Sequence, residues 1–125
     1  MNRQNPLTPT IVFDRALVTW AKSYGGARWE EAYSIQQISD GTCIVAGYTY
    51  SFGTGYSDFW VLKLKSDSTV SWQKAYGGTS SDFAYSAQRT SDGGYIAAGE
   101  TGSFGAGGLI DFWVIKLNSD STVSW

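Results

Sequence analysis

Carboxylates are the main candidates for acid–base chemistry in this sequence, because its 125 residues include no His and one Cys, Cys43. Without His there is no Ser-His-Asp or Cys-His nucleophile, no HExxH zinc site and no imidazole catalysis. A lone Cys excludes cysteine zinc sites and CxxC redox pairs, and Cys43 is expected to be a small buried apolar residue. We therefore expect no catalytic residue, no metal site, no cofactor and no enzymatic activity.

Six aspartates occupy three positions that each occur twice. These are Asp40 and Asp92 in SDG, Asp67 and Asp120 in SDST, and Asp58 and Asp111 at the start of the DFW strands. A catalytic acid and base need different environments to separate their pKa values, whereas equivalent positions supply similar environments. We expect these carboxylates to cap turns by accepting backbone hydrogen bonds.

The aspartates recur because a unit of 52 residues is written twice. Segment 20–71 returns as 72–124, with one additional residue in the second copy. Repetition with a fixed period is typical of repeat architectures. We divide the chain into an N-terminal extension (1–16), a first repeat (17–71) and a second repeat (72–125).

Composition limits the possible partners. A net charge of −2 and a pI of about 4.8, with scattered Lys and Arg, argue against nucleic acid and anionic membranes. No apolar run is long enough to cross a bilayer, and residues 1–20 lack the apolar core of a signal peptide. The compartment stays unknown from these features.

Each repeat is predicted to contain four short strands. The expected ranges are 17–24 and 70–76, then 32–38 and 84–90, then the apolar runs that follow Asp-Gly at 40–41 and 92–93, and finally 58–64 and 111–117. Both faces of the strands DFWVLKL at 58–64 and DFWVIKL at 111–117 are largely apolar, so this strand type is expected to be covered on both sides. Small residues at Ala46, Gly47, Ala98 and Gly99 indicate a crowded backbone.

Several linked motifs carry a resemblance to a known family. The string W-x-K-x-Y-G-G, A-Y-S-x-Q, S-D-G-x-x-I, A-G-x-T-x-S-F-G-x-G and D-F-W-V-x-K-L spans about residues 17–125. It resembles the β-propeller repeats that occur in tandem in secreted and cell-surface proteins of bacteria and archaea. The resemblance implies an all-β fold made of two four-stranded antiparallel blades, a role as an extracellular or surface scaffold or binding module, and an extracellular or cell-surface location.

Two blades do not close a propeller, which typically has four to eight. A blade that runs from the second strand of one repeat to the first strand of the next is complete at 32–76, whereas the blade that begins at Ala84 is cut short. The strand at 17–24 is then unpaired and could complete the blade of a neighbouring copy. We expect a homo-oligomer, with three copies giving six blades or four copies giving eight. The alternative is a longer array of which this chain is a fragment.

Candidate binding residues are those by which the two copies differ, because shared residues maintain the repeat. Trp29 corresponds to Ser81, and Tyr48, Tyr50 and Tyr56 correspond to Glu100, Gly102 and Leu109. With Arg28, Glu30 and Glu31 nearby, they could form an aromatic platform that stacks a sugar ring. The alternative is that these aromatics pack against the next blade.

Three functional hypotheses follow. The first is a non-enzymatic binding or scaffold module with a glycan or protein ligand. The second is the sharpest form of the first, a lectin-like propeller assembled from several chains, with Arg28, Trp29, Tyr48, Tyr50 and Tyr56 as ligand-binding residues. The third is a fragment of a larger propeller enzyme.

Overall fold

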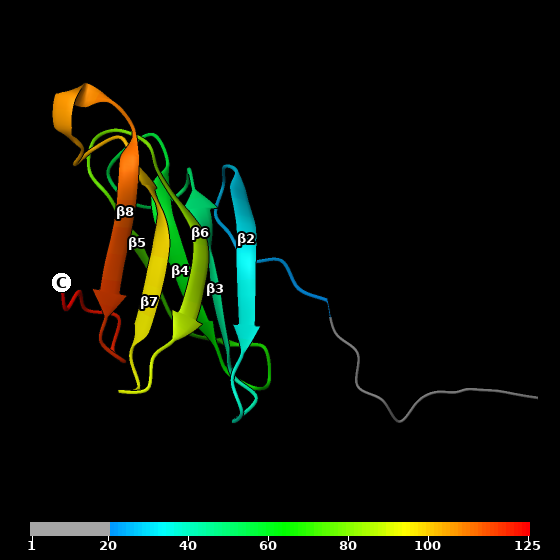
Figure 1. The fold of residues 1–125 in the computed structure, drawn as a ribbon. Coiled ribbons are helices and arrows are strands. Elements are labelled where there is room, and N and C mark those ends of the chain that lie inside the picture. Colours follow the sequence, from blue (N-terminus) through cyan, green and yellow to red (C-terminus); the bar gives the residue numbers. More distant parts are fainter. Residues whose placement is uncertain (1–20) are drawn as a thin grey trace, which may run out of the picture.

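Two antiparallel β-sheets make up the described part of the protein, residues 21–125 of a computed structural model (Figure 1). The one helical element within this range is the short 3-10 helix η2 (Ala106–Gly108). The sheets lie face to face as two layers. The expectation of an all-β chain is confirmed, while the extension 1–16 and residues 17–20 lie outside the described range.

The first sheet crosses the boundary between the repeats. Its strands, in spatial order, are β2 (Glu30–Gln37), β3 (Cys43–Thr49), β4 (Asp58–Leu64) and β5 (Val70–Tyr76). The last of them, β5, begins at the end of the first repeat and lies mostly in the second, so the expected sharing of a strand between repeats is confirmed. The strand expected at 32–38 begins two residues earlier, because Glu30 pairs with Thr49 at the far end of β3.

The second sheet has three strands. They are β6 (Asp82–Arg89), β7 (Tyr95–Thr101) and β8 (Asp111–Leu117), in that order. Beyond them, Val123 forms an isolated bridge with Leu117, and the Trp125 carbonyl accepts a hydrogen bond of 2.8 Å from Lys116 N. The tail thus starts a fourth strand along β8. The first sheet has the four strands expected, and the second has three and the beginning of a fourth, as expected for the shortened set of strands that begins at Ala84.

Residues 21–24, the described part of the strand expected at 17–24, have no strand partner within the chain. This agrees with the expectation that the segment is unpaired in its own chain, and its pairing with a neighbouring copy stays a prediction. The outer edge of the first sheet is occupied by β5. Tyr24 instead packs on the outer face of the first sheet beside Trp60 and Leu62, and its hydroxyl donates a hydrogen bond of 2.6 Å to the Ser68 carbonyl.

Close backbone contact explains the small residues of the third strand. A Cβ atom on Gly47 would lie 1.8 Å from the Glu31 carbonyl oxygen, and one on Gly99 would lie 1.8 Å from the Phe83 carbonyl oxygen. Both approaches occur where the neighbouring strand shifts register at a bulge, around Tyr33 in β2 and Tyr85 in β6. The expected crowding is therefore confirmed at Gly47 and Gly99, and its cause is a bulge in the adjacent strand. Ala98, in contrast, is exposed.

The main core lies between the two sheets. The first sheet contributes Ile44, Ala46, Phe59 and Val61, and the second contributes Ala84, Ala87, Tyr95, Ala97, Ile115 and Leu117. A second cluster of Trp60, Leu62 and Leu64 covers the opposite face of β4, with half-buried Cys43 against it. The prediction that this strand type is buried on both faces is confirmed for β4 and wrong for β8, where Phe112 and Val114 are exposed because no further sheet covers them in the single chain. Cys43 is less buried than expected.

Polar contacts also join the two sheets. We call the interface between the two sheets, its apolar core and its polar contacts together, the internal seam. Ser34 Oγ and Gln36 Oε1 on β2 accept hydrogen bonds of 3.1 and 2.8 Å from backbone N–H groups of β6. At one end, Asp82 N donates to the Ser57 carbonyl at 2.8 Å. At the other, the Tyr76 hydroxyl donates to the Ser121 carbonyl at 2.6 Å.

Candidate functional site

All six repeated aspartates cap turns or loops, as expected. Those of SDG and SDST accept a hydrogen bond from the backbone N–H two residues later, which belongs to Thr42, Gly94, Thr69 and Thr122. Hydrogen bonds from threonine hydroxyls, together with these N–H groups, lower the pKa of Asp40, Asp67, Asp92 and Asp120. For Asp92, Lys116 contributes a salt bridge of 2.9 Å. Fixed, ionised carboxylates of this kind stabilise turns.

Asp58 differs because burial raises its pKa, with the nearby charge of Asp82 acting in the same direction. Its two oxygens nevertheless accept hydrogen bonds from Thr54 N at 2.7 Å and Gly55 N at 3.3 Å. Asp82 accepts from Gly78 N and from the hydroxyls of Thr101 and Ser103. Both carboxylates thus hold their own loops closed.

Tyr48 belongs to an aromatic cluster that bridges the two sheets. Its ring centroid lies 4.9 Å from that of Phe83 on β6, 5.9 Å from that of Tyr33 on β2 and 5.6 Å from that of Tyr50. Tyr33 in turn lies 5.0 Å from Tyr85. This packing matches the alternative in which the aromatics fill the contact between neighbouring sheets.

One member of this cluster has a polar end that faces solvent. The Tyr33 hydroxyl donates a hydrogen bond of 2.9 Å to Glu31, which raises the pKa of Tyr33 to about 12. Comparison of the two copies could not single out this residue, because Tyr85 stands at the same place in the second repeat. The signal that marks the pair is the bulge, which turns both side chains out of the regular alternation of the strand.

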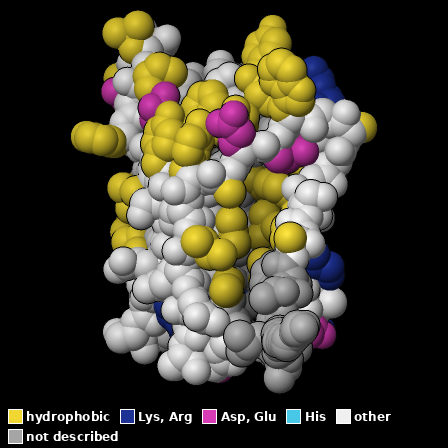
Figure 2. All heavy atoms as spheres, turned by 90° about the vertical axis from the view of Figure 1, so that its right-hand side faces the viewer, with side chains coloured by type: hydrophobic (Ala, Val, Ile, Leu, Met, Phe, Trp, Pro, Cys, Tyr) yellow, Lys and Arg dark blue, Asp and Glu magenta, His cyan; other side chains and the backbone are white. Residues whose placement is uncertain are grey.

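Trp29 stands between two hollows at the end of the molecule where β2 begins. Its side chain is 79% exposed. On one side, Arg28, Trp29 and Tyr50 line a hollow of about 420 Å³, and on the other a hollow of about 540 Å³ is lined by Trp29 with Tyr24, Arg28, Glu30 and Glu31. Figure 2 looks onto the β2 side, where hydrophobic side chains gather at this end beside acidic ones.

The predicted binding residues therefore do not form one platform. Arg28, Trp29 and Tyr50 share a hollow, and Tyr48 lies in the adjoining aromatic cluster. Tyr56 is 75% exposed in the loop that follows β3 and lines neither hollow.

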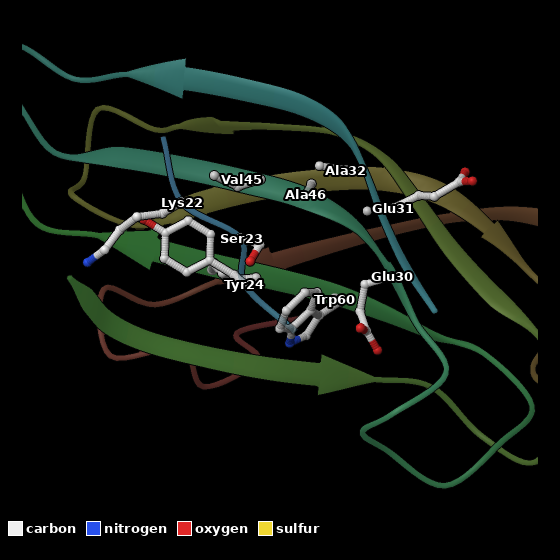
Figure 3. A pocket seen from close by; sticks show the side chains of 11 residues that line it. Lys22, Ser23, Tyr24, Glu30, Glu31, Ala32, Val45, Ala46 and Trp60 are labelled. Carbon is white, nitrogen blue, oxygen red and sulfur yellow. The ribbon is translucent and has the colours of Figure 1, made fainter. Parts of the chain in front are cut away.

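A third cavity, of about 240 Å³, lies on the outer face of the first sheet (Figure 3). Val45, Trp60 and Leu62 form its apolar floor, and the segment that carries Lys22, Ser23 and Tyr24 runs along one side. Glu30 and Glu31 lie at its end. Its exposed lining is mainly apolar.

Two features are absent from residues 21–125: a metal-binding group of side chains and a membrane-spanning helix. No group of three or more His, Cys, Asp or Glu in that range is arranged to hold a metal ion. Within the same range, no helix has the length and apolar character needed to span a membrane.

Comparison of the sequence with models of protein families gives no match. Comparison with curated proteins gives none either. The function therefore has to be argued from the sheets, their faces and the hollows around Trp29.

Proposed function

We propose that this protein is a non-enzymatic β-propeller repeat module that serves as an extracellular or surface scaffold or binding unit. Each sheet is one blade, and further copies of the chain complete the ring. The face-to-face packing of the sheets, the strand shared between repeats and the resemblance of the repeated motifs all support this reading.

One observation carries the proposal: equivalent residues of the two sheets have opposite exposures. Phe59 on β4 is 0% exposed in the internal seam, whereas Phe112, at the same place on β8, is 96% exposed. Val61 and Val114 differ in the same direction, as do Ala46 and Ala98. The second sheet thus presents to solvent the surface that the first sheet buries, and a large apolar surface of this kind marks an interaction site.

The outer face of the first sheet offers the matching surface. In the internal seam the Phe59 ring makes an edge contact with Trp113, their centroids 5.3 Å apart. Trp60 is the equivalent of Trp113, and it lines the 240 Å³ cavity. We assign this cavity to Phe112 of a second copy, because the repeat places the same two residue types there.

Tyr24 supports the same geometry. Its hydroxyl reaches the Ser68 carbonyl at 2.6 Å on the first sheet, just as the Tyr76 hydroxyl reaches the Ser121 carbonyl at 2.6 Å on the second. Tyr76 is the last residue of the outermost strand of the sheet before the seam. Residues 21–24 therefore lie where the outermost strand of a preceding blade would end, and we propose that they complete the three-stranded sheet of a neighbouring copy.

Such a contact joins two different surfaces, so it closes into a ring only at a fixed number of copies. We propose three copies and six blades, with four copies and eight blades as the alternative. Native mass spectrometry of the folded protein tests this: the expected mass is three times the 13.6 kDa of one chain. A folded protein that keeps the mass of one chain at all concentrations would overturn the proposal.

A lectin-like function is the second candidate, favoured by the exposed Trp29 indole beside Arg28 and Tyr50. The 420 Å³ hollow falls in the range of small-ligand sites. A glycan array on the native protein tests it, with Trp29→Ser as the matched variant because Ser occupies this place in the second repeat.

A further inference from the structure

We propose that Trp29 of one copy and Ile110 of the next form an apolar contact that makes the seam between copies chemically different from the internal seam. This inference rests on the proposed ring. It assigns the hollows beside Trp29 to a loop of a second copy of this chain.

The internal seam shows which backbone segments meet at the end of the molecule where β2 begins. Residues 54–57 of the first repeat lie against residues 78–82 of the second: Asp82 N donates to the Ser57 carbonyl at 2.8 Å, and Thr54 Oγ1 donates to the Gly78 carbonyl at 3.2 Å. The approach is close, since a Cβ atom on Gly55 would lie 2.3 Å from the Ser80 carbonyl oxygen.

Because the two repeats are equivalent, the corresponding residues on the outer surfaces are expected to meet in the same way. Position 110 corresponds to Ser57, and position 29 corresponds to Ser81, the residue before Asp82. The supporting loops share their capping hydrogen bonds, although the loop before Asp111 has one additional residue and contains η2. Ala106 N donates to Asp111 as Thr54 N does to Asp58, and Gly26 N donates to Glu30 as Gly78 N does to Asp82. In a ring, Ile110 of one copy is therefore brought next to Trp29 of the following copy.

The chemistry at these two positions differs between the seams. In the internal seam, Ser57 is 1% exposed and its hydroxyl has no hydrogen-bond partner in the protein, so an apolar side chain at this buried position loses no hydrogen bond to the protein. The chain places Ile at the equivalent outer position, where it is 55% exposed, and Trp29 at the position equivalent to Ser81. An isoleucine is suited to a buried position, and Trp is enriched among residues that anchor interfaces.

This difference determines which surfaces pair. An apolar Trp–Ile contact is available only between the end of the second repeat and the beginning of the first, whereas the internal seam offers serines at both positions. Copies therefore join head to tail: the end of the second repeat of one copy meets the beginning of the first repeat of the next. If an outer surface paired with a surface of the internal seam instead, Trp29 or Ile110 would meet a serine. The copy-specific residues at this end thus act in self-assembly.

The test compares Trp29→Ser and Ile110→Ser, which place the internal-seam residue on the outer surface, with Tyr56→Ser as the control. Tyr56 is equally exposed, but it lies in the loop of the first repeat, which the ring does not bring to the seam between copies. Native mass measured over a dilution series gives the concentration at which half of the copies dissociate. We expect this concentration to rise at least tenfold in each of the first two variants and to stay unchanged in Tyr56→Ser.

The double variant sharpens the result. If the two side chains touch, Trp29→Ser combined with Ile110→Ser weakens assembly by less than the product of the single effects. A wild-type ring that is unaffected by either substitution overturns this inference and leaves the ring in place. A wild-type protein that stays a single chain overturns both, and a Trp29→Ser variant that assembles normally but loses glycan binding assigns the hollow to a sugar instead.

Discussion

Replacement of two equivalent phenylalanines by Ala tests the arrangement of the sheets most directly. Phe59 is fully buried in the internal seam, between Trp113 at 5.3 Å and Tyr76 at 6.5 Å, whereas Phe112 is almost fully exposed. Loss of a buried Phe side chain costs about 3–5 kcal/mol, because both the transfer free energy and the contacts around the cavity are lost. Substitutions at exposed positions change stability by about 0.5 kcal/mol or less.

In dilute solution, where single chains are measured, Phe59→Ala is expected to lower the free energy of unfolding by about 3–5 kcal/mol and Phe112→Ala by about 0.5 kcal/mol or less. The assay is guanidinium unfolding followed by circular dichroism. Since the larger loss could unfold the chain outright, Phe59→Leu serves as a milder variant. Equal losses for Phe59→Ala and Phe112→Ala would refute the face-to-face packing described here.

The variants Phe59→Ala and Phe112→Ala also test the proposed interface between copies, at concentrations where the proposal expects copies to assemble. If the Phe112 ring enters the cavity beside Trp60, the loss on Phe112→Ala approaches that of Phe59→Ala, and about 3–5 kcal/mol corresponds to a weakening of assembly by at least a hundredfold. Sedimentation equilibrium measures it. Assembly of Phe112→Ala at the wild-type concentration would refute the proposed interface while leaving the internal seam intact.

Three further predictions concern the scaffold. Gly47→Ala is expected to destabilise the fold by more than 2 kcal/mol, because its Cβ would clash with a backbone carbonyl, whereas Gly107→Ala, with no neighbour within 4 Å and a positive φ, should cost only about 1 kcal/mol; urea unfolding compares them. Tyr76→Phe removes the hydrogen bond to the Ser121 carbonyl and should cost about 1 kcal/mol by the same assay, and a neutral result would mean that this bond contributes nothing. Stability should fall as the pH drops below about 4, because the turn aspartates have lowered pKa values when folded and lose their contribution as they protonate; a smaller slope in Asp92→Asn checks the assignment.

Much of the fold could be predicted from the sequence because the signals are local and occur twice. Alternation of apolar residues marks β4, and Asp-Gly marks the turn before β3. The turn aspartates could be assigned for the same reason, since their partners are two residues away. The start of β2 could not be predicted, because Glu30 joins the strand only by pairing with Thr49, which is distant in the sequence.

The candidate site could be predicted less well. Comparison of the copies found Trp29, Arg28 and Tyr50, which share a hollow, but it also selected Tyr48, which packs against Phe83 on the other sheet. Difference between copies marks a position that the repeat does not require. It does not distinguish a surface that binds a ligand from one that meets another sheet.

By itself, the sequence determines the repeat unit, the strand order within a sheet and the capped turns, since each of these depends on residues close together along the chain. Only the tertiary structure decides which identical residues are buried. Phe59 and Phe112 follow the same pattern in sequence, and one is enclosed because a second sheet covers it, whereas the other faces solvent. Burial depends on what lies across the face of a sheet, and this is a property that two equal sequences do not reveal.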